Sequence, residues 1–243
     1  ATMWGRSVYD NIRRFLQFQL TVNVVALLLV FIGASAGFDP PLNAVMMLWV
    51  NLIMDTMGAL ALGTEEPTPE LLNRRPYKRT APLISRPMIR NILSQSFAQL
   101  IILLVLLFAS DSMFEFESSS TVHYTVIFNT FVFWQLFNEF NARSIFDDWR
   151  VFHGVIRNPI FVAVIILTAG MQAFIVEVGG SFTQTTGLTA GQWGISIGLG
   201  ALALPVGFLM RFIPVVEDPD TFFDNTSTKW LITEGSEEHK STK

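Results

Sequence analysis

The sequence predicts an all-α integral membrane protein with six transmembrane helices and both termini in the cytosol. Of the 243 residues, 51% are hydrophobic and only 15% are charged, whereas about a quarter of the residues in soluble domains are charged. The hydrophobic residues gather into six blocks of about twenty, and a helix of that length crosses a hydrocarbon core of roughly 30 Å. A soluble globular enzyme is therefore not expected.

The six predicted spans are separated by short connections and one longer loop. Their bounds are residues 15–36, 42–63, 91–109, 124–142, 160–178 and 193–213. A charged arm (1–14) precedes the first span, and Pro40 and Pro41 suit the turn before the second, because Pro fixes φ and lacks an N–H. The loop before the third span (64–90) is rich in Pro and basic residues, and the polar tail (214–243) is expected to be disordered.

The positions of Lys and Arg predict the side of the membrane that each connection faces. The connections 37–41, 110–123 and 179–192 contain no basic residue, and all 16 Lys and Arg lie elsewhere in the chain. Because cytosolic loops carry an excess of Lys and Arg, these three connections are expected on the outer side. The arm, the long loop and the tail are then cytosolic.

Composition also limits the functions that this chain can have. A net charge of −4 gives no indication of nucleic-acid binding, and the absence of Cys excludes disulfides and thiolate metal sites. The chain has no Walker Gly-rich loop and no soluble domain large enough to bind a nucleotide. We therefore expect no covalent chemistry from this chain alone. Its first residues lack the order of a signal peptide, so we expect that the chain begins within a longer protein.

One acidic residue, Asp55, lies near the middle of a predicted span. Charged side chains are costly within hydrocarbon, so such a residue is a candidate for function. Asn51 precedes it by four residues, which predicts that both side chains project from one helix face. Carboxylate and amide oxygens suit a hard cation such as Ca²⁺, whereas zinc and copper favour His or Cys. The alternative is a buried carboxylate that is paired only for folding.

Other polar residues within the spans could complete or border such a site. They are Gln19 and Asn23 in the first span, and Gln135, Asn138 and Glu139 in the fourth. Each could instead only form hydrogen bonds with a neighbouring helix. Glu139 also lies four residues before Arg143 near the predicted cytosolic end of its span, which offers a local explanation for its charge. Gly58 could serve as a hinge or as a packing position.

Four segments have the residues and the spacing of a known family. They are MWGRSVYD (3–10), FLQFQLTVNVV (15–25), LWVNLIMD (48–55) followed by ALAL (59–62), and FNTF (128–131) followed by QLFNEFNAR (135–143). The chain resembles the carboxy-terminal membrane half of the P-type calcium ATPases, of the plasma-membrane and plant or fungal autoinhibited type, over residues 3–214. The resemblance implies that the six spans correspond to the fifth to tenth transmembrane helices of a ten-helix pump.

The resemblance also implies a calcium site in which Asn51 and Asp55 are ligands. The sarcoplasmic-reticulum branch of the family binds two ions, and three positions of its additional ligands hold other residues here. These positions are Ala26, Met54 and Gln135, which implies a single Ca²⁺ per cycle. Asn23 matches a ligand of the lost second site. Gln135 and Asn138 remain secondary candidates.

By the same resemblance, the loop that contains Arg86 and Arg90 contacts the phosphorylation domain and relays its movement, although both residues could merely anchor the third span. The phosphorylation, nucleotide and actuator domains would precede Ala1, so ATP and Mg²⁺ would act only through this missing amino-terminal part. The chain is accordingly interpreted as a fragment or truncated form, in a plasma-membrane, vacuolar or other endomembrane bilayer. The tail shows no basic amphipathic calmodulin target. The alternative is a naturally short, non-enzymatic membrane protein that regulates a full-length pump or passes cations passively.

Overall fold

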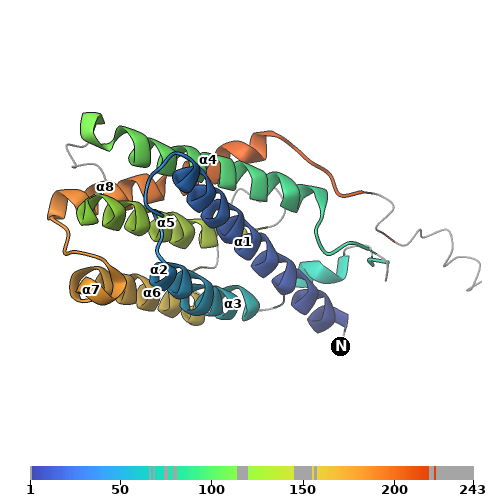
Figure 1. Cartoon of the computed structure of the whole chain (residues 1–243). Helices are drawn as coiled ribbons and strands as arrows, with labels where there is room; N and C mark the ends of the chain where they lie inside the picture. Colours follow the sequence, from blue (N-terminus) through green and yellow to red (C-terminus); the bar gives the residue numbers. More distant parts are fainter. Residues whose placement is uncertain are drawn as a thin grey trace, which may run out of the picture.

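The computed structural model describes residues 2–65, 67, 69–73, 76–78, 81–113, 120–144, 155, 158–218 and 222, and in these ranges it is a bundle of helices (Figure 1). The continuous helices are α1 (Thr2–Ser35), α4 (Arg86–Met113), α5 (Thr121–Ala142) and α6 (Pro159–Val178). Two further positions hold interrupted helices: α2 (Ala44–Leu48), a π-helical turn (Trp49–Met54) and α3 (Asp55–Gly63), then α8 (Ala190–Ala201), α9 (Ala203–Leu209) and a 3₁₀ turn (Met210–Phe212). A 3₁₀ turn (Pro69–Asn73) and α7 (Gly180–Thr183) are short.

Helices occupy all six positions at which spans were predicted. Within the described ranges, five of them are long and apolar enough to cross a membrane, and α5 is not among these five. Of its 22 residues 16 are buried, because α5 contacts α1, α4, α6, α8 and α9. A polar helix can lie at membrane depth when other helices cover its polar groups. Helix length and composition therefore support five membrane spans. The sixth span and the cytosolic location of the termini remain predictions.

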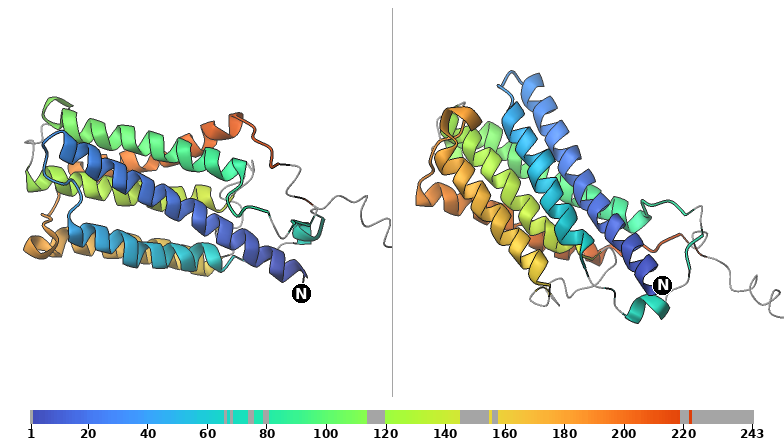
Figure 2. Two further views of the ribbon diagram at one scale, coloured as in Figure 1. Left: turned by 45° about the vertical axis from the view of Figure 1, so that its right-hand side comes forward. Right: turned by 90° about the horizontal axis from the view of Figure 1, so that it is seen from below.

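The first helix is longer than the predicted first span. It includes the predicted arm and runs for 34 residues, or about 50 Å, so its first turns extend beyond a hydrocarbon core. The helix ends before Gly37, which adopts a φ of +84° that glycine tolerates without strain. In both views of Figure 2 the amino terminus and the chain leaving α9 lie at the same end of the bundle.

In the second predicted span, α2 and α3 are joined end to end by the π-helical turn, with no break in the helical backbone. The N–H of Asp55 donates to the carbonyl of Val50, five residues earlier, instead of four. Such turns are rare and are often found at functional sites. The helix begins at Asn43, whose side-chain oxygen accepts the N–H of Met46 at 2.8 Å.

Three amides on the inner face of α4 connect that helix to its neighbours. Asn91, Gln95 and Gln99 are spaced four residues apart, and each is at most 2% exposed. Asn91 donates to Gln17 of α1 at 3.2 Å, Gln95 donates to the carbonyl of Ala203 at 3.1 Å, and Gln99 donates to a carbonyl of α5 at 3.3 Å. Interhelical bonds of this kind satisfy polar groups that lipid cannot.

The close contact between α5 and α8 depends on Gly200. A Cβ atom at Gly200 would lie 2.8 Å from the Cβ of Phe133 and 2.9 Å from the backbone nitrogen of Trp134. Small residues at such positions allow two helix backbones to approach closely. This contact holds α5 in the centre of the bundle, where it presents polar side chains toward α3 and α4.

Candidate functional site

Asp55 is the first residue of α3 and lies directly after the π-helical turn. Its side chain is buried, with 5% exposed. One carboxylate oxygen, Oδ2, accepts a hydrogen bond from Nε2 of Gln19 on α1 at 3.3 Å. The other, Oδ1, is buried and has no hydrogen-bond partner among the described residues. A buried carboxylate oxygen without a donor is costly, which is typical of a group that binds a ligand.

The predicted partner of Asp55 occupies a different environment. Asn51 lies within the π-helical turn and is exposed at the surface of the described bundle, as is Asn23 on α1. The π-helical turn adds a residue between the α-helical segments, so a spacing of four no longer gives the angular offset of an α-helix. Asn23 and Gln19 are one turn apart on α1. The structure thus places the buried Asp55 carboxylate beside Gln19. The amides of Asn23 on α1 and Asn51 in the second span are exposed.

Glu139 on α5 is completely buried, and neither of its carboxylate oxygens has a hydrogen-bond partner in the described ranges. The local explanation from sequence, a pairing with Arg143 four residues later, is wrong, because the Arg143 side chain binds Glu65 instead. Glu139 and Asp55 lie on helices that contact each other, α5 and α3. A Cβ atom at Gly58 would lie 3.6 Å from Oε1 of Glu139 and 2.8 Å from a ring carbon of Phe18, so Gly58 is a packing position.

The other two candidates on α5 are also buried. Nε2 of Gln135 donates to Oε1 of Gln99 on α4 at 2.6 Å. This interhelical hydrogen bond is the alternative to a role at the site that the sequence left open for Gln135. Its own Oε1 is buried without a partner among the described residues. Asn138 is 4% exposed. Within the described ranges, no group of three or more His, Cys, Asp and Glu side chains could hold a metal ion by itself.

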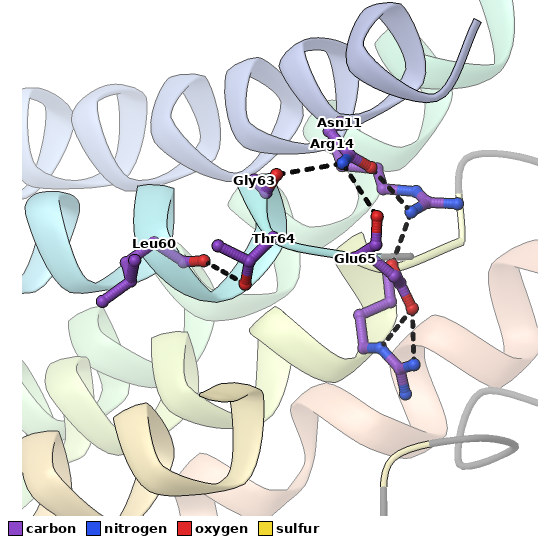
Figure 3. Close-up of polar contacts among 7 residues, drawn as sticks. Asn11, Arg14, Leu60, Gly63, Thr64 and Glu65 are labelled. Carbon is purple, nitrogen blue, oxygen red and sulfur yellow. Dashed lines mark hydrogen bonds and ion pairs between the residues drawn. The ribbon is translucent and has the colours of Figure 1, made fainter. Parts of the chain in front are cut away.

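The end of α3 is fixed to two other helices through Glu65 (Figure 3). Oε2 of Glu65 pairs with Arg14 of α1 at 2.5 Å, and Oε1 pairs with Arg143, next to the end of α5, at 2.5 Å. Asn11 donates to the carbonyls of Gly63 and Glu65 at 3.0 and 3.2 Å. Glu65 is a functional candidate that the sequence did not single out, although an acidic residue two positions after this helix, in a basic loop, was an available signal.

Arg86 and Arg90, the predicted relay residues, contact the segment that follows α9. Arg86 pairs with Asp218 at 2.6 Å, and Arg90 donates to the carbonyl of Ile213 at 2.6 Å. Residues 214–218 of the tail therefore make defined contacts. The remainder of the tail lies outside the described residues, apart from Phe222, whose ring stacks on Tyr77.

A buried ion pair lies beside these contacts. Arg13 of α1 pairs with Glu217, and its guanidinium lies over the ring of Tyr77 at 5.3 Å. The hydroxyl of Tyr77 accepts from Arg13 and donates to Oε2 of Glu217, both at 2.9 Å. Burial raises the pKa of Tyr77 to about 12, so its hydroxyl stays protonated at neutral pH. The cluster joins α1, the loop 64–90 and the segment after α9.

Replacing Tyr77 with Phe is expected to loosen the segment after α9. The change removes a donor to Glu217 and an acceptor from Arg13, which costs about 1–3 kcal/mol when buried partners remain. Proteolysis within residues 213–218 should therefore accelerate about 5- to 150-fold under conditions in which cleavage follows local opening. Tyr9→Phe, on the neighbouring ring that stacks near Tyr77, is the matched control. Equal cleavage rates in both variants would contradict the assignment.

The profile of the family described as "Cation transporting ATPase, C-terminus" matches residues 39–213. Plasma membrane calcium-transporting ATPase 4 of Homo sapiens is 52% identical over 212 residues, which cover 83% of this chain and 17% of that protein. Putative calcium-transporting ATPase 13, plasma membrane-type, of Arabidopsis thaliana is 50% identical over 214 residues, or 88% of this chain and 21% of that protein. The chain therefore spans about a fifth of the length of these curated relatives.

Proposed function

The chain belongs to the family of cation-transporting ATPase carboxy-terminal regions, and from this premise we propose that it is the membrane half of an ATP-driven calcium pump. In this proposal Asn51 and Asp55 ligate a single Ca²⁺ as it crosses the membrane. The observation that carries the proposal is the buried Asp55, which has an oxygen without a partner among the described residues and follows a π-helical turn. Ca²⁺ prefers oxygen ligands of this kind.

The described residues supply only part of the six to eight oxygens that Ca²⁺ takes. Asn23 on α1 and Asn51 in the second span are exposed, and an exposed amide facing lipid is unfavourable. We propose that a further part of the pump covers this surface and completes the site. That part would also bring ATP and Mg²⁺, since phosphoryl transfer requires nucleotide, metal and acceptor to be held together.

Movement of the cytosolic domains would reach the site through the end of α3. Glu65 lies ten residues after Asp55 and is paired with both Arg14 and Arg143. Arg86 and Arg90, at the start of α4, connect the loop to the segment after α9. In this proposal, displacement of the loop changes these pairings and moves α3 relative to α1 and α5.

The proposal is tested by ATP-dependent uptake of ⁴⁵Ca²⁺ into membrane vesicles that contain the full-length product of the gene encoding this chain. Uptake above that of vesicles without the protein, lost when ATP is omitted, is the expected result. A full-length product that gives no such uptake would contradict the proposal. The plasma-membrane-type relatives favour plasma membrane as the first membrane to fractionate.

An immunoblot against residues 226–243 separates this proposal from the alternative of a naturally short, non-enzymatic membrane protein. A band several-fold heavier than a 243-residue chain is expected for a complete pump. A band at the size of this chain alone would favour the regulatory or passive role.

A further inference from the structure

We propose that Glu139 of α5 is an additional carboxylate ligand of the transported cation, opposite Asp55. This inference rests on the proposed function and adds a residue to its site. It starts from an observation that the sequence did not suggest: Glu139 is completely buried, and both of its carboxylate oxygens lack hydrogen-bond partners among the described residues.

A carboxylate in this position needs a compensating charge. A carboxyl group that is buried in a low-dielectric interior is paired, coordinates a metal or is protonated, because an isolated charge there is very costly. The nearest explanation, Arg143, is engaged by Glu65 through two hydrogen bonds of 3.1 and 2.5 Å. Asp55 and Glu139 are both buried, at 5% and 0% exposed, and three of their four carboxylate oxygens have no hydrogen-bond partner among the described residues.

The packing around Gly58 directs Glu139 toward the helix that carries Asp55. Gly58 lies one turn after Asp55 on α3, and a Cβ atom there would contact Oε1 of Glu139 at 3.6 Å. The same Cβ would be 2.8 Å from the Phe18 ring of α1, so any side chain at Gly58 would displace a neighbour. The missing side chain allows α1, α3 and α5 to meet, with the carboxylate of Glu139 facing α3.

The chemistry of this arrangement suits a divalent hard cation. Two carboxylates neutralise two positive charges, and Oδ1 of Asp55 together with both oxygens of Glu139 gives three buried acceptors that have no donor among the described residues. Calcium sites commonly combine monodentate and bidentate carboxylates with amide oxygens. Gln19, which donates to the other oxygen of Asp55 at 3.3 Å, holds that carboxylate in place when no cation is bound.

The test is Glu139→Gln in the full-length gene product, which keeps the shape of the side chain and removes its charge. We expect the Ca²⁺ concentration for half-maximal ATP-dependent uptake to rise about tenfold or more, the scale on which groups around a metal site alter its affinity. Glu139→Asp should give an intermediate value. Glu177→Gln is the matched control, because Glu177 is a carboxylate near the carboxy-terminal end of α6 that accepts hydrogen bonds from Leu188 and Trp193.

A purely structural role for Glu139 predicts a different result. If Glu139 binds the cation, added Ca²⁺ should raise the denaturation temperature of Glu139→Gln less than that of the wild type, whereas a purely structural role predicts an equal rise in both. A half-maximal Ca²⁺ concentration within about twofold of the wild type would overturn the inference and leave the proposed function intact. Failure of the wild type itself to take up Ca²⁺ would overturn both.

Discussion

Replacing Asp55 with Asn is expected to abolish ATP-dependent calcium uptake while leaving the protein in the membrane. The change removes the negative charge from a side chain that is 5% exposed and keeps its size, so packing against α1 should persist. The loss in Ca²⁺ affinity should exceed about 100-fold, the upper range for residues that merely support a metal ligand. Uptake of ⁴⁵Ca²⁺ over a wide range of Ca²⁺ concentrations measures it.

The control for Asp55→Asn is a substitution of Gln19, the residue of α1 that donates a hydrogen bond to Asp55. Gln19→Leu removes the hydrogen bond to Oδ2 of Asp55 but no charge, so it should alter Ca²⁺ dependence far less than Asp55→Asn. Surface labelling and fractionation establish that both variants reach the membrane in equal amounts. Calcium uptake by Asp55→Asn at wild-type Ca²⁺ concentrations would remove Asp55 from the site.

Replacing Glu65 with Ala is expected to have the second large effect, on stability and uptake together. The change leaves Arg143, whose side chain is 8% exposed, and Arg14 without their shared carboxylate. The cost should lie between the roughly 1 kcal/mol of an exposed ion pair and the about 3–5 kcal/mol of a buried pair that loses one partner. Thermal denaturation of the detergent-solubilised full-length product, followed with and without Ca²⁺, measures this cost.

A double-mutant cycle assigns the effect of Glu65→Ala to its partners. Arg143→Met alone should destabilise the protein, and its combination with Glu65→Ala should cost less than the sum of the two, because the pair is already lost. Glu65→Gln retains hydrogen-bonding capacity and should fall between the wild type and Glu65→Ala. Additive costs in the cycle would mean that Glu65 stabilises α3 by some other contact.

The all-helical membrane fold could be predicted from sequence because hydrophobic blocks are a local property, and five of the predicted spans are helices long and apolar enough to cross a membrane. The family resemblance is confirmed by the matching profile and by relatives that are 50% identical or more. The predicted starts at 124 and 160 lie inside α5 and α6, which begin at Thr121 and Pro159, directly after amino-terminal caps. Ser120 and Asn158 accept backbone N–H groups three residues later, at 3.2 and 3.1 Å, just before α5 and α6.

The environment of the candidate site could not be predicted in the same way. The burial of Glu139 results from the helices that surround α5, and its position near Arg143 in sequence suggested a pairing that Glu65 prevents. The π-helical turn has no marker in the segment from Trp49 to Met54, since neither Gly nor Pro occurs there. Whether Asn51 completes the site with Asp55 remains a prediction.

The π-helical turn also determines the rotational phase of the second span. Each residue of an α-helix advances the chain by about 100° around the axis, so the one additional residue turns α2 by roughly that angle relative to α3. Deleting any single residue between Trp49 and Met54 would restore regular geometry and rotate Met46, now buried, away from its neighbours. The angle between the buried faces of α2 and α3 is therefore set by the number of residues in the turn, whatever those residues are.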